Sequence, residues 1–211
     1  MSFDWKNFLL GSLTSIIGIT FISFGAALSE KMNMGLDPFT AINRGASSLL
    51  GFSLGNYQLV VNLIILMIVF LMKRSLIGWG TIYNMILVGY QVEFFNTIFS
   101  NIFNVEAMGL LLRLIVTVIA ILIFTFGVAI YMDTELGVSP YDAIAPLITD
   151  RTSWSYTPVR VGQDLLVVAG AFLLSGPVGI STIITGFFAG PLINFFSKRV
   201  SQPLLKNLTQ S

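Results

Sequence analysis

Two short stretches of the chain, about 102 residues apart, share a pattern that suits a polar binding site. Gly35–Ile42 reads Gly-Leu-Asp-Pro-Phe-Thr-Ala-Ile, and Gly137–Ile144 reads Gly-Val-Ser-Pro-Tyr-Asp-Ala-Ile. Aspartate and serine are favoured helix N-caps, and proline is favoured at the first helical position. The pattern therefore predicts two helix starts whose residues are candidates for substrate binding. These candidates are Asp37, Pro38, Phe39 and Thr40 in the first copy, and Ser139, Pro140, Tyr141 and Asp142 in the second.

The chemistry of such a site comes from the backbone. The first N–H groups of a helix have no partner within the helix and carry a partial positive charge. Two such ends brought together at membrane depth would bind a carboxylate, a phosphate or a neutral polar solute. The alternative is that both are ordinary caps at the membrane surface.

A second set of candidates lies on one helix face. Gln58 and Asn62 are four residues apart, and their counterparts about 102 residues on are Arg160 and Asp164. Ionisable groups inside a spanning helix are costly and by default indicate function. Asp164 is a candidate for a substrate or proton site, and Arg160 for meeting an anion or holding Asp164. The alternatives are an Arg–Asp pair that extends to the interface and amides that only join helices.

The composition limits the class of protein. The chain is 55% hydrophobic and 10% charged, so lipid must cover most of its exterior. Its net charge of +1 gives no argument for nucleic acid. It contains neither cysteine nor histidine, which excludes disulfides, zinc sites with Cys or His ligands, and Ser–His or Cys–His nucleophiles. We expect no enzyme activity, no cofactor and no metal.

The hydrophobic pattern predicts six membrane-spanning helices. Each apolar segment approaches the roughly 20 residues that cross a hydrocarbon core. The first is too long for the apolar part of a signal peptide and has a counterpart in the second half, so we expect it to be retained. The predicted spans are Phe8–Leu28, Tyr57–Met72, Trp79–Phe99, Leu110–Met132, Val159–Leu174 and Ile180–Phe196.

Two shorter segments, Phe39–Leu50 and Tyr141–Thr149, follow the repeated motifs. About 12 helical residues extend only about 18 Å, which is too short to cross a membrane. We expect half-helices that either dip into the bilayer and return or lie at its edge.

The number of crossings decides the symmetry. Three crossings per half turn the second half upside down, which predicts an all-α polytopic membrane protein of two inverted repeats, residues 1–104 and 105–211, that form one membrane domain. Each repeat has three transmembrane helices and one half-helix. If the short segments crossed, the repeat would be parallel. Both arrangements satisfy the positive-inside rule with cytoplasmic termini, but Lys73-Arg74 is cytoplasmic only in the inverted one.

With these residues in view, the chain resembles the YczE/YitT-type family of bacterial multi-pass membrane proteins. The resemblance rests on Gly35–Ile42, on Gly137–Ile144, on the Arg160-x-x-x-Asp164 helix start and on Gly179–Gly190. It implies a bacterial plasma-membrane protein and little about chemistry. The paired short segments also resemble the half-helices of aquaporin-type channels, but the Asn-Pro-Ala triplet is missing, so that similarity is architectural only.

The leading hypothesis is a secondary transporter or permease for a small polar or anionic solute, with Asp164 as the candidate for proton coupling. The alternatives are a passive channel for a small polar solute and a scaffold or regulator of a partner protein within the lipid bilayer. A homo-oligomer is compatible with all three. The sequence does not name the solute, its direction of transport or the coupling ion.

Overall fold

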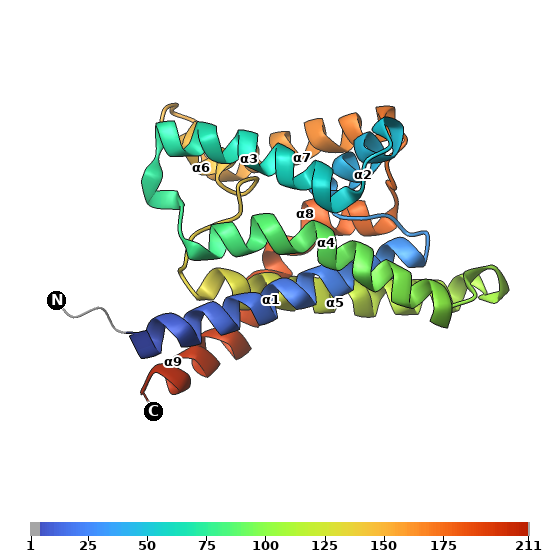
Figure 1. Ribbon diagram of the computed structural model, residues 1–211, viewed down its shortest axis with the longest axis horizontal. Coiled ribbons are helices and arrows are strands. Elements are labelled where there is room, and N and C mark those ends of the chain that lie inside the picture. Colours follow the sequence, from blue (N-terminus) through green and yellow to red (C-terminus); the bar gives the residue numbers. More distant parts are fainter. Residues whose placement is uncertain (1–4, 211) are drawn as a thin grey trace.

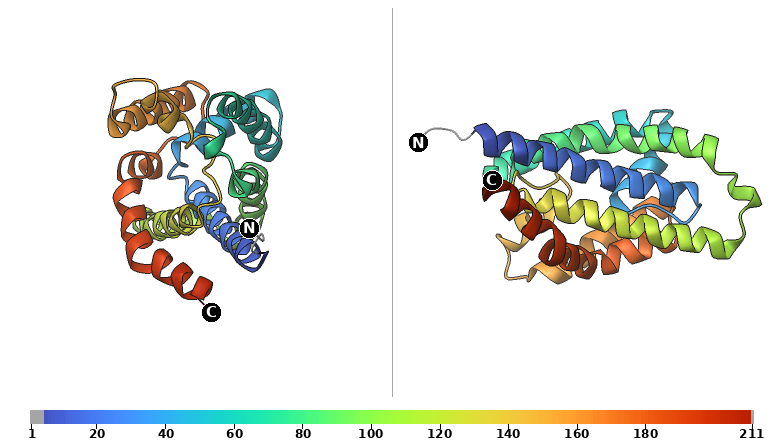
Figure 2. Two further views of the ribbon diagram at one scale, coloured as in Figure 1. Left: turned by 90° about the vertical axis from the view of Figure 1, so that its left-hand side faces the viewer. Right: turned by 90° about the horizontal axis from the view of Figure 1, so that it is seen from below.

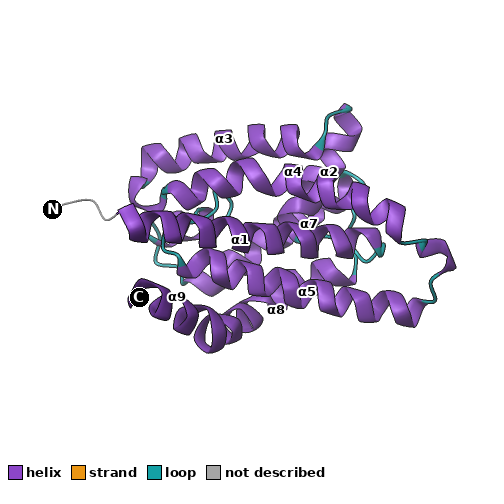
Figure 3. Cartoon of the chain, turned by 60° about the horizontal axis from the view of Figure 1, so that its bottom comes forward, coloured by secondary structure: helices purple, strands orange, loops and turns teal. Residues whose placement is uncertain are grey.

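The computed structural model describes residues 5–210, and all regular secondary structure in this range is helical (Figure 3). Short turns join the helices. In chain order the elements are α1 (Trp5–Lys31), α2 (Pro38–Leu50), α3 (Leu54–Met72), the 3-10 turn η1 (Arg74–Leu76), α4 (Trp79–Ile102), the 3-10 turn η2 (Val105–Ala107), α5 (Leu110–Asp133), α6 (Ile144–Thr149), α7 (Tyr156–Leu173), α8 (Ile180–Phe196), the π-helical segment η3 (Ser197–Ser201) and α9 (Gln202–Gln210).

Each of the six predicted spans is a helix: α1, α3, α4, α5, α7 and α8. Four helices within the described chain are long and apolar enough to cross a membrane: α1, α3, α5 and the continuous helix Ile180–Asn207. The other two, α4 and α7, carry amide and charged side chains that lower their mean hydropathy, among them Asn84, Glu93 and Asp164. The protein is therefore an all-helical membrane protein.

The first short helix begins where the sequence predicts. The carboxylate of Asp37 accepts a hydrogen bond from the backbone N–H of Thr40 at 3.0 Å, and Pro38 is the first helical residue. The helix ends at Gly51, whose φ of 72° is left-handed.

The prediction for the second short helix is wrong at its start. Residues 140–143 form turns, and α6 begins only at Ile144. The hydroxyl of Ser139 still accepts a hydrogen bond from the N–H of Asp142 at 3.1 Å, so the cap is present. Pro146 has no N–H to donate to the carbonyl of Asp142, and the first helical turn cannot close.

The long helices α1 and α5 pack against each other in opposite directions along one side of the bundle (Figure 2). Glycines allow this close approach. A Cβ at Gly25 would lie 2.5 Å from the carbonyl oxygen of Ala120, and one at Gly127 would lie 2.6 Å from that of Gly18. The two contacts involve residues 102 positions apart, so each helix offers the same surface to the other.

The segment after each of these long helices contacts the other half of the chain. The amide of Ser181, at the start of α8, donates to the carbonyl of Met34 at 2.8 Å. The amide of Gly80, at the start of α4, donates to the carbonyl of Leu136, also at 2.8 Å. These paired hydrogen bonds fix both connecting segments within the bundle.

The bundle has two ends. The terminal end holds the start of α1, the turn between α3 and α4, and α9 (Figure 1). The distal end holds the turn between α4 and α5, residues 103–109. Contacts support this arrangement, because Gly11 near the start of α1 and Gly78 before α4 both approach Leu136. Between the ends, apolar side chains such as Leu13, Leu71 and Leu111 are exposed and suited to lipid.

Candidate functional site

A cavity of about 730 Å³ lies where the starts of the two short segments meet. The ring of Phe39 stacks on the ring of Tyr141, with centroids 4.6 Å apart and planes at 19°. These two residues occupy equivalent positions in the repeated motif. Beyond this contact α2 and α6 run to opposite ends of the bundle (Figure 1). The meeting of the two motifs therefore marks the middle of the molecule.

A charged cluster forms one wall of the cavity. Arg160 on α7 pairs with Asp142 at 2.6 Å and with Asp164 at 3.2 Å. The hydroxyl of Tyr141 donates to the second oxygen of Asp164 at 2.5 Å, and the guanidinium of Arg160 lies 4.9 Å from the centroid of the Tyr141 ring. Asp164 is only 6% exposed. Both acids thus share one guanidinium, which leaves the cluster with one formal negative charge.

The two amides of the first half take different places. Gln58 lines the cavity and is buried, and its side-chain oxygen has no hydrogen-bond partner. Asn62, one turn further along α3, is also buried but does not line the cavity. Of the site candidates from the sequence, only Asn62 and Pro140 lie outside the lining. The candidates that do line it are Asp37, Pro38, Phe39, Thr40, Gln58, Ser139, Tyr141, Asp142, Arg160 and Asp164.

Sequence reasoning missed two polar residues at the end of α5 that also line the cavity, Tyr131 and Asp133. Asp133 accepts a hydrogen bond from the hydroxyl of Ser197 at 2.9 Å, and its other oxygen is buried without a partner. An acid at the end of a long apolar run is typical of an interfacial residue. Only the packing of α5 beside α8 turns it toward the cavity.

The cavity reaches the surface between α7 and α8, toward the terminal end. Tyr156, the first residue of α7, and Phe187 on α8 both line it and are about half exposed, at 51% and 48%. Gly190 also lines it, and a Cβ there would meet nothing within 4 Å. The start of α7 and the middle of α8 are thus separated rather than packed together.

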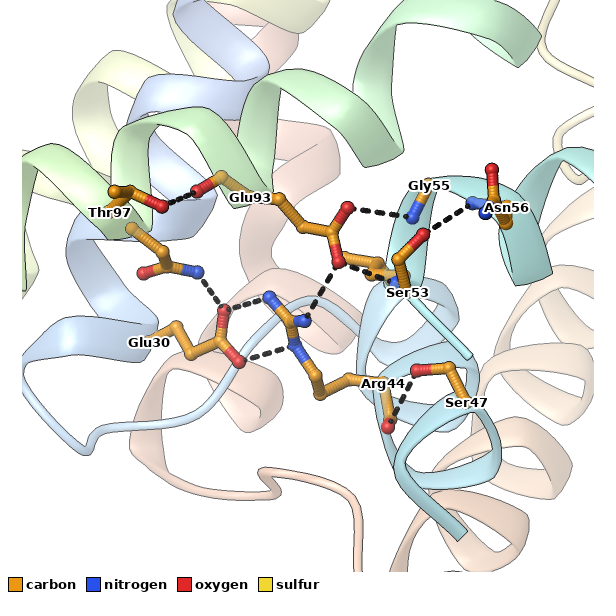
Figure 4. Close-up of polar contacts among 10 residues, drawn as sticks. Glu30, Arg44, Ser47, Ser53, Gly55, Asn56, Glu93 and Thr97 are labelled. Carbon is orange, nitrogen blue, oxygen red and sulfur yellow. Dashed lines mark hydrogen bonds and ion pairs between the residues drawn. The ribbon is translucent and has the colours of Figure 1, made fainter. Parts of the chain in front are cut away.

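The distal end is closed by a polar cluster that joins α1, α2, α3 and α4 (Figure 4). The carboxylate of Glu93 on α4 accepts hydrogen bonds from the backbone N–H groups of Leu54 and Gly55, at 2.6 and 3.3 Å. Arg44 on α2 binds Glu30 at 2.7 Å and lies 3.8 Å from Glu93. We call Glu30, Arg44 and Glu93 the distal cluster.

The outer face of the distal cluster is a shallow depression of about 850 Å³ lined by Glu30, Arg44 and Asn96. The described residues contain no group of three or more acidic side chains placed to hold a metal ion.

Apolar helices around a cavity with a charged cluster in its wall define an integral membrane protein of the polytopic helical class. Comparison with known families assigns it further: residues 10–198 match the family of unknown function DUF6198, and the chain belongs to this family. The resemblance to YczE-type proteins predicted from the sequence is confirmed.

Three relatives match most of this chain. It is 27% identical over 179 residues to the uncharacterized membrane protein YczE of Bacillus subtilis (strain 168). The aligned residues make up 84% of this chain and 81% of YczE. It is 26% identical over 192 residues to the uncharacterized protein YyaS of the same organism, covering 90% and 93%. An uncharacterized protein of Haemophilus influenzae (strain ATCC 51907 / DSM 11121 / KW20 / Rd) is 25% identical over 181 residues, covering 86% and 80%. No solved structure matches.

Proposed function

We propose that this protein is a secondary transporter of the bacterial plasma membrane that works by alternating access. It is built from two inverted repeats, each of three spanning helices and one short helix, with both termini in the cytoplasm. The central cavity binds a small solute, and Asp164, held by Arg160 and Tyr141, carries a coupling proton.

Contacts between equivalent residues support the inverted repeat. The helices α1 and α5, which correspond in the two halves, pack in opposite directions through the same glycine surface. Phe39 and Tyr141, which also correspond, stack on each other. The turn between α3 and α4, which contains Lys73-Arg74, lies at the terminal end, as the inverted arrangement requires (Figure 1). A parallel repeat would instead place the corresponding helices α1 and α5 in the same direction.

The single observation that carries the proposal is that corresponding helix pairs in the two halves pack differently. Gly89 on α4 packs against Gly55 on α3, since a Cβ at Gly89 would lie 2.8 Å from the Cα of Gly55. Their counterparts in the second half are Thr157 on α7, 102 residues on, and Gly190 on α8, 101 residues on. The second offset is the one that aligns Gly78-Trp79-Gly80 with Gly179-Ile180-Ser181. A Cβ at Gly190 would meet nothing within 4 Å, and both counterparts line the cavity. The pair α3 and α4 is therefore closed at the distal end, whereas the corresponding pair α7 and α8 is open at the terminal end.

The hydrogen bonds follow the same asymmetry. Glu93 binds the first N–H groups of α3, whereas its counterpart Asn194 lines the cavity. The N-cap of α7, Ser155, makes no hydrogen bond through its side chain. In the opposite state, Asn194 could therefore bind the first turn of α7 in the way that Glu93 binds the first turn of α3 here. Exchanging the two conformations between the halves gives the opposite state, with α7 packed on α8 and α3 moved away from α4.

A cysteine pair tests this exchange directly, because the native chain contains no cysteine. We expect Thr157→Cys/Gly190→Cys in native membranes to form a disulfide on oxidation, which requires α7 and α8 to approach until the Cα atoms are about 4.4–6.8 Å apart. Gel mobility with and without reductant measures the fraction joined. Gly162→Cys/Gly190→Cys is the negative control, since Gly162 on α7 does not line the cavity.

The positive control is Ser29→Cys/Ser181→Cys, whose native hydroxyl oxygens lie 3.2 Å apart. If the positive control is oxidised and Thr157→Cys/Gly190→Cys is not, the proposal of alternating access is wrong. A passive channel predicts that result together with solute flux that does not saturate. A scaffold predicts it with no flux at all in liposomes.

A further inference from the structure

The charges around the central cavity are unbalanced. Its charged lining residues are one arginine and four aspartates: Arg160, Asp37, Asp133, Asp142 and Asp164. Arg160 is already paired with Asp142 and Asp164. Neither Asp37 nor Asp133 forms an ion pair within the described part of the chain. An anion entering this cavity would meet an excess of negative charge and no uncommitted cation.

The helix starts that predicted an anion site are also occupied. The carboxylate of Asp37 binds the N–H of Thr40 at the start of α2, and the hydroxyl of Ser139 binds the N–H of Asp142. At α2 the cap is itself an acid. When it is ionised, it offsets the partial positive charge that the start of α2 would otherwise offer to a ligand.

Most of the buried polar atoms without partners require donors. Four residues that line the cavity each have a buried side-chain oxygen that makes no hydrogen bond within the described part of the chain: Asp37, Gln58, Tyr131 and Asp133. Gln58 and Tyr131 are only 3% and 2% exposed, so these oxygens lie deep in the molecule. The phenol of Tyr131 can also donate, but the other three oxygens are acceptors. A buried acceptor without a donor is unfavourable, and a ligand N–H group that reached it would satisfy it.

The rest of the lining is apolar and aromatic. Phe39, Phe124, Phe187 and Ile193 line the cavity together with the tyrosines. A volume of about 730 Å³ holds a drug-sized molecule. Aromatic faces also attract cations, as Arg160 over Tyr141 illustrates.

From these four features we infer that the cavity binds an amphiphilic organic cation, with a protonated amine toward Asp37 and Asp133 and an apolar body against the aromatic wall. That this cation is the transported substrate rests on the proposed function, but its binding is tested without a transport assay. It differs from the small polar or anionic solute that the sequence predicted.

The test uses three probes that share one body: 4-phenylbutylammonium, 4-phenylbutyrate and 4-phenylbutanamide. Purified full-length protein in detergent is titrated with each probe by calorimetry, and thermal unfolding is followed in parallel. We expect saturable binding and a higher Tm with the ammonium, and at least tenfold weaker binding of the carboxylate and the neutral amide.

Two variants locate the binding site. Asp37→Asn and Asp133→Asn should each weaken ammonium binding by about tenfold, because each removes a charge that has no cationic partner. Asparagine is also a good N-cap, so Asp37→Asn keeps the start of α2. Glu106→Gln, an exposed acid in η2, is the control and should leave binding unchanged.

Equal or tighter binding of 4-phenylbutyrate, or undiminished ammonium binding in both aspartate variants, would overturn the inference. The disulfide experiment separates its failure from that of the proposed function. A disulfide between positions 157 and 190 with no preference for the cation refutes the substrate class alone. Selective cation binding without that disulfide refutes alternating access alone.

Discussion

Removing the charge of Glu93 should open the distal end. In Glu93→Gln the side chain keeps its length but loses its negative charge. In the native protein this carboxylate holds the first turn of α3 against α4 through the N–H groups of Leu54 and Gly55 (Figure 4). The proposed opposite state lacks these contacts, so the substitution destabilises only the state described here.

The magnitude follows from the contacts. A hydrogen bond to a charged group contributes about 1.5–3 kcal/mol, and a carboxylate at a helix N-terminus adds about 0.3–1 kcal/mol. Glutamine keeps one acceptor oxygen, so we expect a loss of about 2 kcal/mol. The pair with Arg44, at 3.8 Å and partly exposed, adds little. At about 1.4 kcal/mol per tenfold, the ratio of the two states changes roughly 30-fold.

A thiol on α4 measures this change. Met85 is buried one turn before Gly89, and its counterpart Gly186 lines the cavity. In membranes carrying Met85→Cys, a polar thiol reagent added on the distal side should react slowly, because only the opposite state exposes this position. Adding Glu93→Gln should raise the rate by up to about 30-fold when the opposite state is the minor one. The control Glu106→Gln should change it less than about twofold.

A second thiol distinguishes the proposed exchange from general loosening. Gly190→Cys has room for its side chain and is open in the present state. Its reaction rate from the terminal side should stay constant or fall in Glu93→Gln. An unchanged rate at position 85, or rates that rise together at positions 85 and 190, would refute the reasoning.

Three further predictions use other contacts. Asp164→Asn should abolish any pH dependence of uptake in proteoliposomes but leave the protein folded, because asparagine keeps one oxygen to accept from Tyr141 while Arg160 keeps its pair with Asp142; a pH profile that matches the native protein removes the proton role. Gly25→Ala should lower the free energy of unfolding by about 1–3 kcal/mol, because its Cβ would lie 2.5 Å from the carbonyl oxygen of Ala120. Gly162→Ala is the control and should not lower it, because a Cβ at Gly162 would meet nothing within 4 Å. Equal melting temperatures of the two variants by calorimetry would contradict the helix packing. Lys73→Cys should react with an impermeant thiol reagent only from the side that carries the termini, and reaction only from the other side would exclude the inverted repeat.

The first short helix illustrates what local sequence determines. Asp37, Pro38 and Gly51 mark the start and end of α2 because caps and left-handed residues act within a few positions. The same logic failed at Ser139-Pro140. There Pro146, six residues further on, removed a backbone donor and delayed the helix to Ile144. Both proline positions are visible in the sequence, but their combined effect depends on the geometry of the turn.

The candidate site shows a similar division. Asp142 and Arg160 were each candidates from the sequence. Asp142 belongs to the second copy of the repeated motif, and Arg160 corresponds to Gln58 in the first half. That they form an ion pair at 2.6 Å is a property of how α7 packs beside the second connecting segment. Asp133 was missed because nothing local distinguishes an acid that faces water from one that faces a cavity.

The sequence by itself determined that the chain is a helical membrane protein, where its apolar helices lie, and that two segments repeat, because hydrophobicity, length and similarity are local or additive properties. Only the tertiary structure decided that Phe39 stacks on Tyr141, that Glu93 closes one end while Gly190 leaves the other open, and that carboxylates outnumber cations around the cavity. These features depend on distances between residues far apart in the chain. Such distances are set by the packing of whole helices, which neither composition nor spacing encodes.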